Sequence, residues 1–109
     1  MGCLSGKKPG CIVIVNVPIR DDMRDEWRAF AKNDPAGLAK LTRPYKGCLS
    51  MTYTINDETN VITLVENWTD RAAFDAYLQY RKENGMQGLV EKFATGPPQF
   101  TFLNPDHGV

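Results

Sequence analysis

The stretch Val65–Arg81, VENWTDRAAFDAYLQYR, gathers side chains suited to holding an aromatic small molecule. Its pattern predicts a strand that ends at Trp68, a helix cap, and a helix that carries Phe74, Tyr77 and Tyr80. Such rings either fill a core or line a cavity, and Trp and Tyr add a hydrogen-bonding group to the apolar surface. Tyr77 shares the apolar stripe with Phe74, so it is the tyrosine expected to face the sheet.

A further polar group is expected inside the fold, on the first strand. Cys11–Ile19 is β-branched and almost continuously apolar, which predicts a central strand with Asn16 as its one polar interruption. The two-residue alternation of a strand places Asn16 on one face with Ile12 and Ile14. Because an unpaired buried amide costs about 1–3 kcal/mol, Asn16 must either satisfy a backbone group or serve a ligand.

The composition argues against several kinds of reactive site. The single histidine, His107, lies in the segment NPDHGV near the end of the chain, which leaves no imidazole in the body for a metal ion, a haem iron or a Ser–His pair. Cys3, Cys11 and Cys48 lack C-x-x-C spacing, so reduced structural thiols are expected. No side chain is an obvious strong base. We therefore expect no metal and no cofactor.

Charge and hydropathy limit the partners. Thirteen basic and thirteen acidic residues are mixed along the 109 positions, whereas nucleic acid requires clustered Lys or Arg. The run CIVIVNVPI is far shorter than the roughly 20 residues that span a bilayer, and no secretory signal is evident, so a cytoplasmic protein is expected. Membrane contact is expected only if Gly2 or Cys3 is acylated, and the N-myristoylation pattern fails at Gly6, where Ser or Thr is required.

Two helical patterns flank a predicted hairpin. Asp21 or Asp22 is expected to cap the first helix, and Asp34-Pro35 is expected to break it and restart a short turn. Its apolar stripe consists of Met23, Trp27, Phe30 and Ala31. Alternating strands over 47–55 and 61–68, joined by NDETN, predict an antiparallel hairpin.

The second helix is expected to be capped by Thr69 or Asp70 and to stop at Gly85. Its inward stripe is predicted to be Ala73, Phe74, Tyr77, Leu78 and Arg81. A short helical piece over 89–93 and a final strand over 99–103 complete the chain.

The resulting order, βαββαβ, predicts an α+β fold of the ferredoxin-like kind, with a four-stranded antiparallel sheet and helices on one face. Because the strands are apolar on both faces, the bare face is expected to pack against a second copy. A homodimer, forming a dimeric α+β barrel, is therefore predicted. Residues 1–10 are expected to be a disordered leader, 11–104 the domain, and 105–109 a tail.

The segments GCLSMTYT and ITLVENWTDRAAFDAYLQ, followed by a closing apolar strand, resemble the antibiotic biosynthesis monooxygenase domain over residues 12–103. This family consists of small dimeric α+β barrels. The most specific part of the resemblance is the Glu-x-Trp element, Glu66 to Trp68, followed by a helix that begins with Ala73 and Phe74.

The resemblance implies a site between the helices and the sheet. Asn16 matches an Asn of the first strand used by relatives, and Trp68 and Tyr77 are similar in placement to their cavity rings, so these three are expected to be catalytic hydrogen-bond donors. The expected substrate-binding side chains are Trp27, Phe74, Tyr80 and Arg81, with Arg81 suited to an anionic group. Relatives that degrade haem need an axial His, which the segment RKENGMQGLVEKF lacks.

Two functions remain open from the sequence. The first is a cofactor-independent monooxygenase that oxidises a small electron-rich aromatic or quinol-type substrate with dioxygen in a dry pocket. The alternative is a dimer of the same fold that binds a small hydrophobic or aromatic ligand without turnover, or acts as a scaffold. In both, Glu66 is expected to be structural, pairing with Arg71 or across the dimer.

Overall fold

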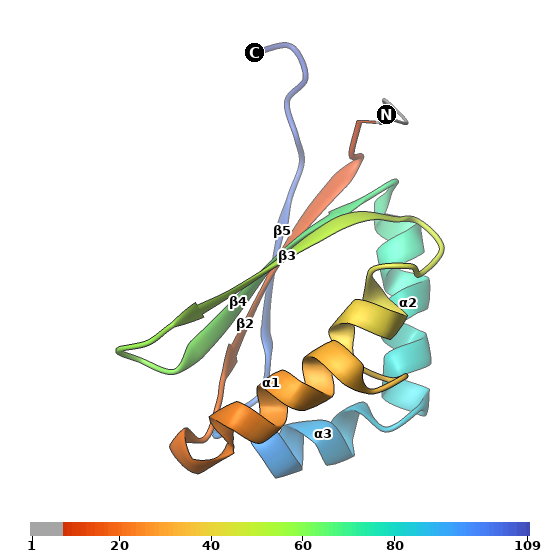
Figure 1. The fold of residues 1–109 in the computed structure, drawn as a ribbon. Coiled ribbons are helices and arrows are strands. Elements are labelled where there is room, and N and C mark those ends of the chain that lie inside the picture. The colour runs from red at the N-terminus through yellow and green to blue at the C-terminus, as the bar shows by residue number, and fades with distance from the viewer. Residues whose placement is uncertain (1–7) are drawn as a thin grey trace.

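The computed structural model describes residues 8–109, in which a twisted sheet carries its helices on one side (Figure 1). The possible acylation sites Gly2 and Cys3 lie outside the described residues. The strands are β2 (Cys11–Pro18), β3 (Cys48–Asn56), β4 (Val61–Trp68) and β5 (Gln99–Leu103). The α-helices are α1 (Arg24–Asn33), α2 (Arg71–Glu83) and α3 (Met86–Phe93), with short helical turns η1 (Asp21–Met23) and η2 (Leu38–Thr42).

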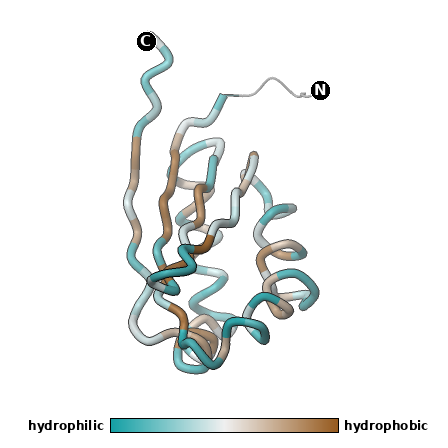
Figure 2. Tube along the Cα trace, turned by 60° about the vertical axis from the view of Figure 1, so that its left-hand side comes forward, coloured by the Kyte–Doolittle hydropathy of each residue, from teal (hydrophilic) through white to brown (hydrophobic). Residues whose placement is uncertain are grey.

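The sheet has the order β3-β4-β2-β5, and every neighbouring pair is antiparallel. This arrangement confirms the predicted ferredoxin-like α+β fold and the central place of β2. Long strand segments are hydrophobic, whereas the helices alternate between hydrophobic and hydrophilic along their turns (Figure 2). That alternation is typical of helices that cover a sheet with one side and meet solvent with the other.

The two faces of the sheet are set by cross-strand register. One row points toward the helices: Met51, Glu66, Val13 and Phe102. The adjacent row points away from them: Thr52, Val65, Ile14 and Thr101. Val13 is 0% exposed, whereas its neighbour Ile14 is only half-buried. We call these the covered face and the open face.

The start of α1 differs from the expected Asp cap. A single 3-10 turn over Asp21–Met23 precedes α1, and no side chain caps either element. Asp21 instead accepts a hydrogen bond from the Asn60 side chain in the β3–β4 turn. The local helix signal at Asp21 and Asp22 was therefore correct about where the chain turns and wrong about capping, because a contact distant in sequence engages the carboxylate.

The segment after α1 packs against α2. Asp34 accepts a hydrogen bond from the backbone N–H of Ala36 at 2.9 Å, as expected for a turn that restarts the chain at Pro35. The turn η2 that follows is a π-helix, and its residues Leu38 and Thr42 are buried. This segment closes one end of the space between the helices and the sheet.

The helix α2 agrees with its predicted cap and stripe. The Asp70 side chain accepts a hydrogen bond from the backbone N–H of Ala73 at 2.7 Å, and Phe74, Tyr77 and Arg81 are its buried residues. Gly85 follows the helix with φ of 97°, a left-handed conformation that glycine adopts without strain. The turn at Gly85 leads into α3, which runs away from the end of α2 and lies below α1 in the view of Figure 1.

No helix within residues 8–109 combines the length and the apolar character required to cross a bilayer.

Candidate active site

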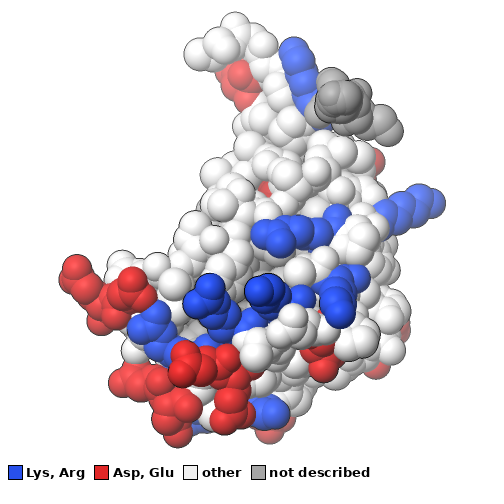
Figure 3. Space-filling model, viewed as in Figure 1, with Lys and Arg blue, Asp and Glu red and all other residues white. Residues whose placement is uncertain are grey.

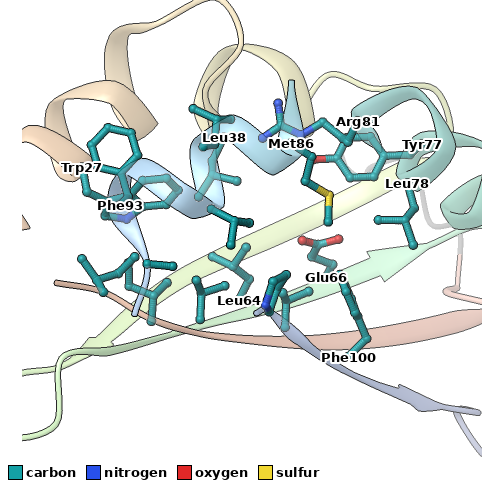
Figure 4. Close-up of a pocket in the computed structure, with 18 of the residues that line it drawn as sticks. Trp27, Leu38, Leu64, Glu66, Tyr77, Leu78, Arg81, Met86, Phe93 and Phe100 are labelled. Atoms are coloured by element: carbon teal, nitrogen blue, oxygen red, sulfur yellow. The ribbon is translucent and has the colours of Figure 1, made fainter. Parts of the chain in front are cut away.

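An apolar hollow of about 100 Å³ lies between the covered face and the helices. Its floor is formed by β2, β4 and β5, and its walls and roof come from α1, η2, α2 and α3. Nearly all of the side chains that line it are hydrophobic, and three, Glu66, Tyr77 and Arg81, are polar (Figure 4). This concentration of apolar walls around a few polar groups is typical of a small-molecule site.

Glu66 is the carboxylate of this hollow. Strand β4 alternates strictly in burial, so Glu66 points to the covered face together with Ile62, Leu64 and Trp68. Its side chain rises from β4 into the space beneath Met86 (Figure 4). Glu66 is 2% exposed, a rare degree of burial for a carboxyl group.

The surroundings of Glu66 change its acidity. Burial raises the pKa of the Glu66 carboxyl above its ordinary value, and the hydrogen bond from Trp68 and the charge of Arg81 offset only part of that rise. Oε1 of Glu66 accepts the indole N–H of Trp68 at 2.9 Å. Among the described residues Glu66 forms no ion pair, and Arg71, its expected partner, pairs with Asp75. Of the two expected partners of Glu66, Arg71 was therefore wrong, and a partner across the dimer stays a prediction.

A carboxyl group in this state is suited to proton transfer. General bases work best when their pKa lies near the operating pH, and burial is the usual way in which proteins raise a carboxyl pKa toward it. The position of Glu66 in an apolar hollow, with one donor fixing one oxygen, fits that requirement.

Tyr77 and Arg81 line the hollow, but both engage the segment after α1. The Tyr77 hydroxyl shares a hydrogen bond of 2.6 Å with the Thr42 hydroxyl, and burial raises the pKa of Tyr77 to about 12. The Arg81 guanidinium donates to the Ala36 carbonyl at 2.6 Å. These two hydrogen bonds hold the segment between α1 and the end of η2 against α2, so they stabilise one wall of the hollow.

Trp68 lies behind Glu66. It is 0% exposed and does not line the hollow, and its indole N–H is donated to Glu66. Its ring packs against Phe74 and Tyr77, with centroids 5.6 and 5.1 Å away. The structure thus gives Trp68 a position from which it orients Glu66.

The predicted substrate-binding residues divide into two groups. Trp27 and Phe74 line the hollow along with Arg81, and Trp27 donates its indole N–H to the Tyr53 hydroxyl at 3.1 Å. Tyr80, in contrast, is 41% exposed and packs on Tyr45 outside the hollow.

Asn16 is separated from the other predicted site residues by the sheet. It pairs with Thr63 and Gln99 in a row of the open face, and the Thr63 hydroxyl donates to its side-chain carbonyl. Its strand neighbours Val15 and Val17 line the hollow on the other side. Asn16 therefore faces away from Glu66.

A signal for Glu66 was present in the sequence. The alternation of Ile62, Leu64, Glu66 and Trp68 with Val61, Thr63, Val65 and Asn67 puts the carboxylate on the same face as a tryptophan. The strand pattern alone does not show whether that face is covered by helices or by a second copy, so it could not assign Glu66 to a cavity.

A second, more open groove lies outside the hollow, between α1, η2 and β3. It has a volume of about 180 Å³ and includes Arg28, Lys32 and Arg43, with no carboxylate among its lining residues. Lys and Arg form a band across this side of the molecule, and acidic side chains gather near the start of α1 (Figure 3). Leu38 lines both the groove and the hollow and so separates them.

The other titratable groups lie apart from the hollow. Within residues 8–109 no group of three or more His, Cys, Asp and Glu side chains is arranged to hold a metal ion. His107 contacts the Pro9 carbonyl at 2.9 Å. Cys11 and Cys48 are free thiols, and burial raises the pKa of Cys48 to about 11.

Residues 10–82 match the family model of antibiotic biosynthesis monooxygenases. The chain belongs to this family. The matched segment runs from the start of β2 almost to the end of α2, so it contains Glu66, Trp68, Tyr77 and Arg81 of this antibiotic biosynthesis monooxygenase family member. A comparison with curated proteins found no match.

Several solved structures are similar to this family member. A conserved protein from Methanosarcina mazei Go1 is 14% identical, with 92% of this chain and 96% of that chain covered and a TM-score of 0.73. The monooxygenase from the gene ActVA-Orf6 of Streptomyces coelicolor, in complex with Nanaomycin D, is 17% identical, with 93% and 91% covered and a TM-score of 0.70. Rv0793 from Mycobacterium tuberculosis is 27% identical, with 88% and 94% covered and a TM-score of 0.63.

Proposed function

We propose that this protein is a cofactor-independent monooxygenase that oxidises a small electron-rich aromatic or quinol-type substrate with dioxygen. The single observation that carries the proposal is Glu66, a buried carboxylate with a raised pKa that faces an apolar hollow. Family membership supports the reaction class, and the complex of the Streptomyces coelicolor monooxygenase with Nanaomycin D supports a small-molecule ligand.

The protein's main contribution is removal of a proton. The substrate hydroxyl donates its proton to Glu66, and the resulting anion is electron-rich enough to pass one electron to dioxygen. The apolar walls keep water from the anion and the oxygen species. Trp68 acts through Glu66 by fixing Oε1 of the carboxylate, which leaves Oε2 for the substrate.

The atoms and electrons of the reaction balance with the substrate and dioxygen alone. For a hydroquinone, the substrate radical and superoxide combine at a ring carbon next to the oxygen, and Glu66 returns its proton to the distal oxygen, giving a hydroperoxide. Glu66 then takes the ring proton from that carbon. A carbonyl forms, the O–O bond breaks, and the expelled hydroxide takes the proton from Glu66 to give water. The products are a hydroxyquinone and one water, and all four electrons come from the substrate.

We also propose that two copies pack through their open faces. Ile12, Ile14 and Val65 are half-buried apolar side chains on this face, with no helix over them. Burying them against a second sheet would remove that apolar surface from water. The predicted role of Asn16 as a catalytic donor stays a prediction, since from this face it would act at the interface and away from Glu66.

The decisive experiment measures oxygen uptake and product formation with a panel of hydroquinones and anthrones. Glu66→Gln keeps an oxygen that accepts the Trp68 N–H but cannot take a proton, so kcat is expected to fall about 10²- to 10⁴-fold. Glu91→Gln, which removes an exposed carboxylate from α3, is the matched control.

The outcomes separate the candidate functions. Turnover by wild type and Glu91→Gln, but not by Glu66→Gln, would support the monooxygenase. The proposal would be contradicted if oxygen uptake in the presence of each of the three proteins were no faster than uptake by the substrate alone. If the substrates still bound, the alternative of a binding or scaffold dimer would be favoured.

A further inference from the structure

We propose that the hollow accepts one neutral aromatic ring whose hydroxyl points at Glu66, and that it discriminates against fused ring systems and anionic rings. This inference deepens the proposed function, on which it rests, by naming the size and charge of the substrate. In this inference Met86 selects the size of the ligand, and Glu66 selects its charge.

The volume of the hollow fits a single ring better than a fused ring system. An engineered apolar cavity of about 150 Å³ in another protein holds benzene, whereas this hollow has about 100 Å³. A one-ring phenol therefore requires small adjustments of the walls. Two or three fused rings require a wall to move, because a packed interior resists extra volume.

Met86 is a wall residue that lies over the polar end of the hollow (Figure 4). It extends from the first turn of α3 over Glu66 (Figure 4), and it is half-buried. An unbranched thioether adapts its shape easily, so Met86 can make the small adjustment that one ring needs. Truncating it would open space directly beside the carboxylate.

The polar atoms of the hollow determine which ligand charge is accepted. The Tyr77 hydroxyl is engaged with Thr42, and Arg81 donates to the Ala36 carbonyl. Oε1 of Glu66 is engaged with Trp68, and no described residue donates to Oε2. Oε2 of Glu66 is therefore an acceptor left open to a ligand hydroxyl, and the negative charge of the carboxylate disfavours a ligand carboxylate placed beside it.

This reasoning changes the role of Arg81. The sequence suggested a partner for an anionic substrate group, but the guanidinium is bound to the backbone of the segment after α1. Arg81 then serves the site as a wall residue and as a nearby positive charge that favours ionisation of Glu66.

The test is equilibrium binding by calorimetry without oxygen, at neutral pH, using three probes. Para-cresol is a neutral ring with a hydroxyl, para-toluate is an anionic ring of similar shape, and naphthol is neutral with two fused rings. Wild type is expected to bind para-cresol about ten-fold or more tightly than para-toluate and about ten-fold more tightly than naphthol.

Two variants address size and charge separately. Met86→Ala is expected to tighten naphthol binding about ten-fold, with Gln87→Ala, an exposed neighbour on α3, as the control. Leu89→Ala, from the same wall, replaces Met86→Ala if that variant does not fold. Glu66→Gln is expected to reduce the preference for para-cresol over para-toluate about ten-fold, with Glu91→Gln as the control.

Several results would overturn the inference. They are equal binding of para-cresol and naphthol by wild type, equal binding of para-cresol and para-toluate, no binding of para-cresol, or no change in either preference in the variants. Because these measurements need no turnover, size and charge selection without oxygen uptake would contradict only the proposed function. Rapid oxidation of anthrones by wild type would contradict only the inference.

Discussion

The covered face and the open face are built from alternating residues of the same four strands, yet they differ in burial and in chemistry. On the covered face Val13, Glu66 and Trp68 are 0–2% exposed, and the carboxylate meets a hollow. On the open face Ile14 and Asn16 are half-buried, and the side-chain oxygen of Asn16 accepts a hydrogen bond from Thr63.

The difference shows how a helical layer changes the acidity of a side chain. Glu66 and Asn16 are both polar residues in apolar strands, but helices lie over Glu66 alone. Removal from water raises the pKa of the carboxyl, whereas an amide does not titrate in this range. Chemistry is therefore expected on the covered face and association on the open face.

Matched charge insertions should give the largest effect. Val13→Asp places a carboxylate in the core without a partner, so we expect a loss of about 4 kcal/mol or more in the free energy of unfolding. Ile14→Asp should leave the fold intact and convert the proposed dimer to monomer. Denaturant unfolding and sedimentation measure the two effects. Equal loss of stability in both variants would contradict the distinction between the faces.

Trp68→Phe tests the hydrogen bond to Glu66 on the covered face. Loss of the indole donor leaves Oε1 unpaired and should cost about 1–3 kcal/mol of stability. It should also raise the pKa of Glu66 further, because that donor lowers it in the wild type. The rise of kcat with pH should therefore move to higher pH. Asn67→Ala, at the adjacent position on the open face, is the control, and an unshifted profile for Trp68→Phe would count against Glu66 as the base.

The pH dependence of stability reports on Glu66 directly. Its pKa is raised in the folded chain, whereas an unfolded glutamate titrates at about 4.3. Between these values the folded state binds more protons, so the contribution of Glu66 to the free energy of unfolding is complete below about pH 4.3 and decreases as pH rises through the folded pKa.

Glu66→Gln removes this dependence. The variant should gain stability relative to wild type as pH rises through that window, and the gain should then level off. Urea unfolding at a series of pH values measures it, and Glu91→Gln controls for removal of a carboxylate. If the free energy of unfolding of wild type instead rose relative to that of Glu66→Gln as pH increased, burial would not destabilise the carboxylate.

Asn16→Ala should have the smallest effect on turnover. Because Asn16 lies across the sheet from the hollow, we expect less than about two-fold change in kcat, together with weaker dimerisation. Oxygen uptake measured at a protein concentration that keeps the variant dimeric tests this. A loss as large as that of Glu66→Gln would establish the predicted catalytic role of Asn16 and refute its placement outside the reactive face.

Much of the fold follows from local pattern. The alternation at 61–68 and the NDETN turn predicted β4 and its hairpin, and the i, i+3, i+4 spacing predicted which side of α2 is buried. Trp27, Phe74, Tyr77 and Arg81 were expected at the site, and each lines the hollow. Local pattern indicates which side of a strand or helix each of these residues occupies, and their roles at the site stay predictions.

The amino-acid sequence by itself determined the order of elements and the two-sided character of the strands, since these depend on residue periodicity along the chain. It also indicated the family, since that resemblance is carried by particular residues such as Glu66, Trp68 and Phe74. Only the tertiary structure decided that Glu66 faces a hollow, that Trp68 orients it, and that Asn16 and Tyr80 lie elsewhere. The physical reason is that periodicity identifies which residues share a face, but not which other elements pack over that face. Burial, and with it the raised pKa of a carboxyl group, arises only when helices distant in sequence pack over that face.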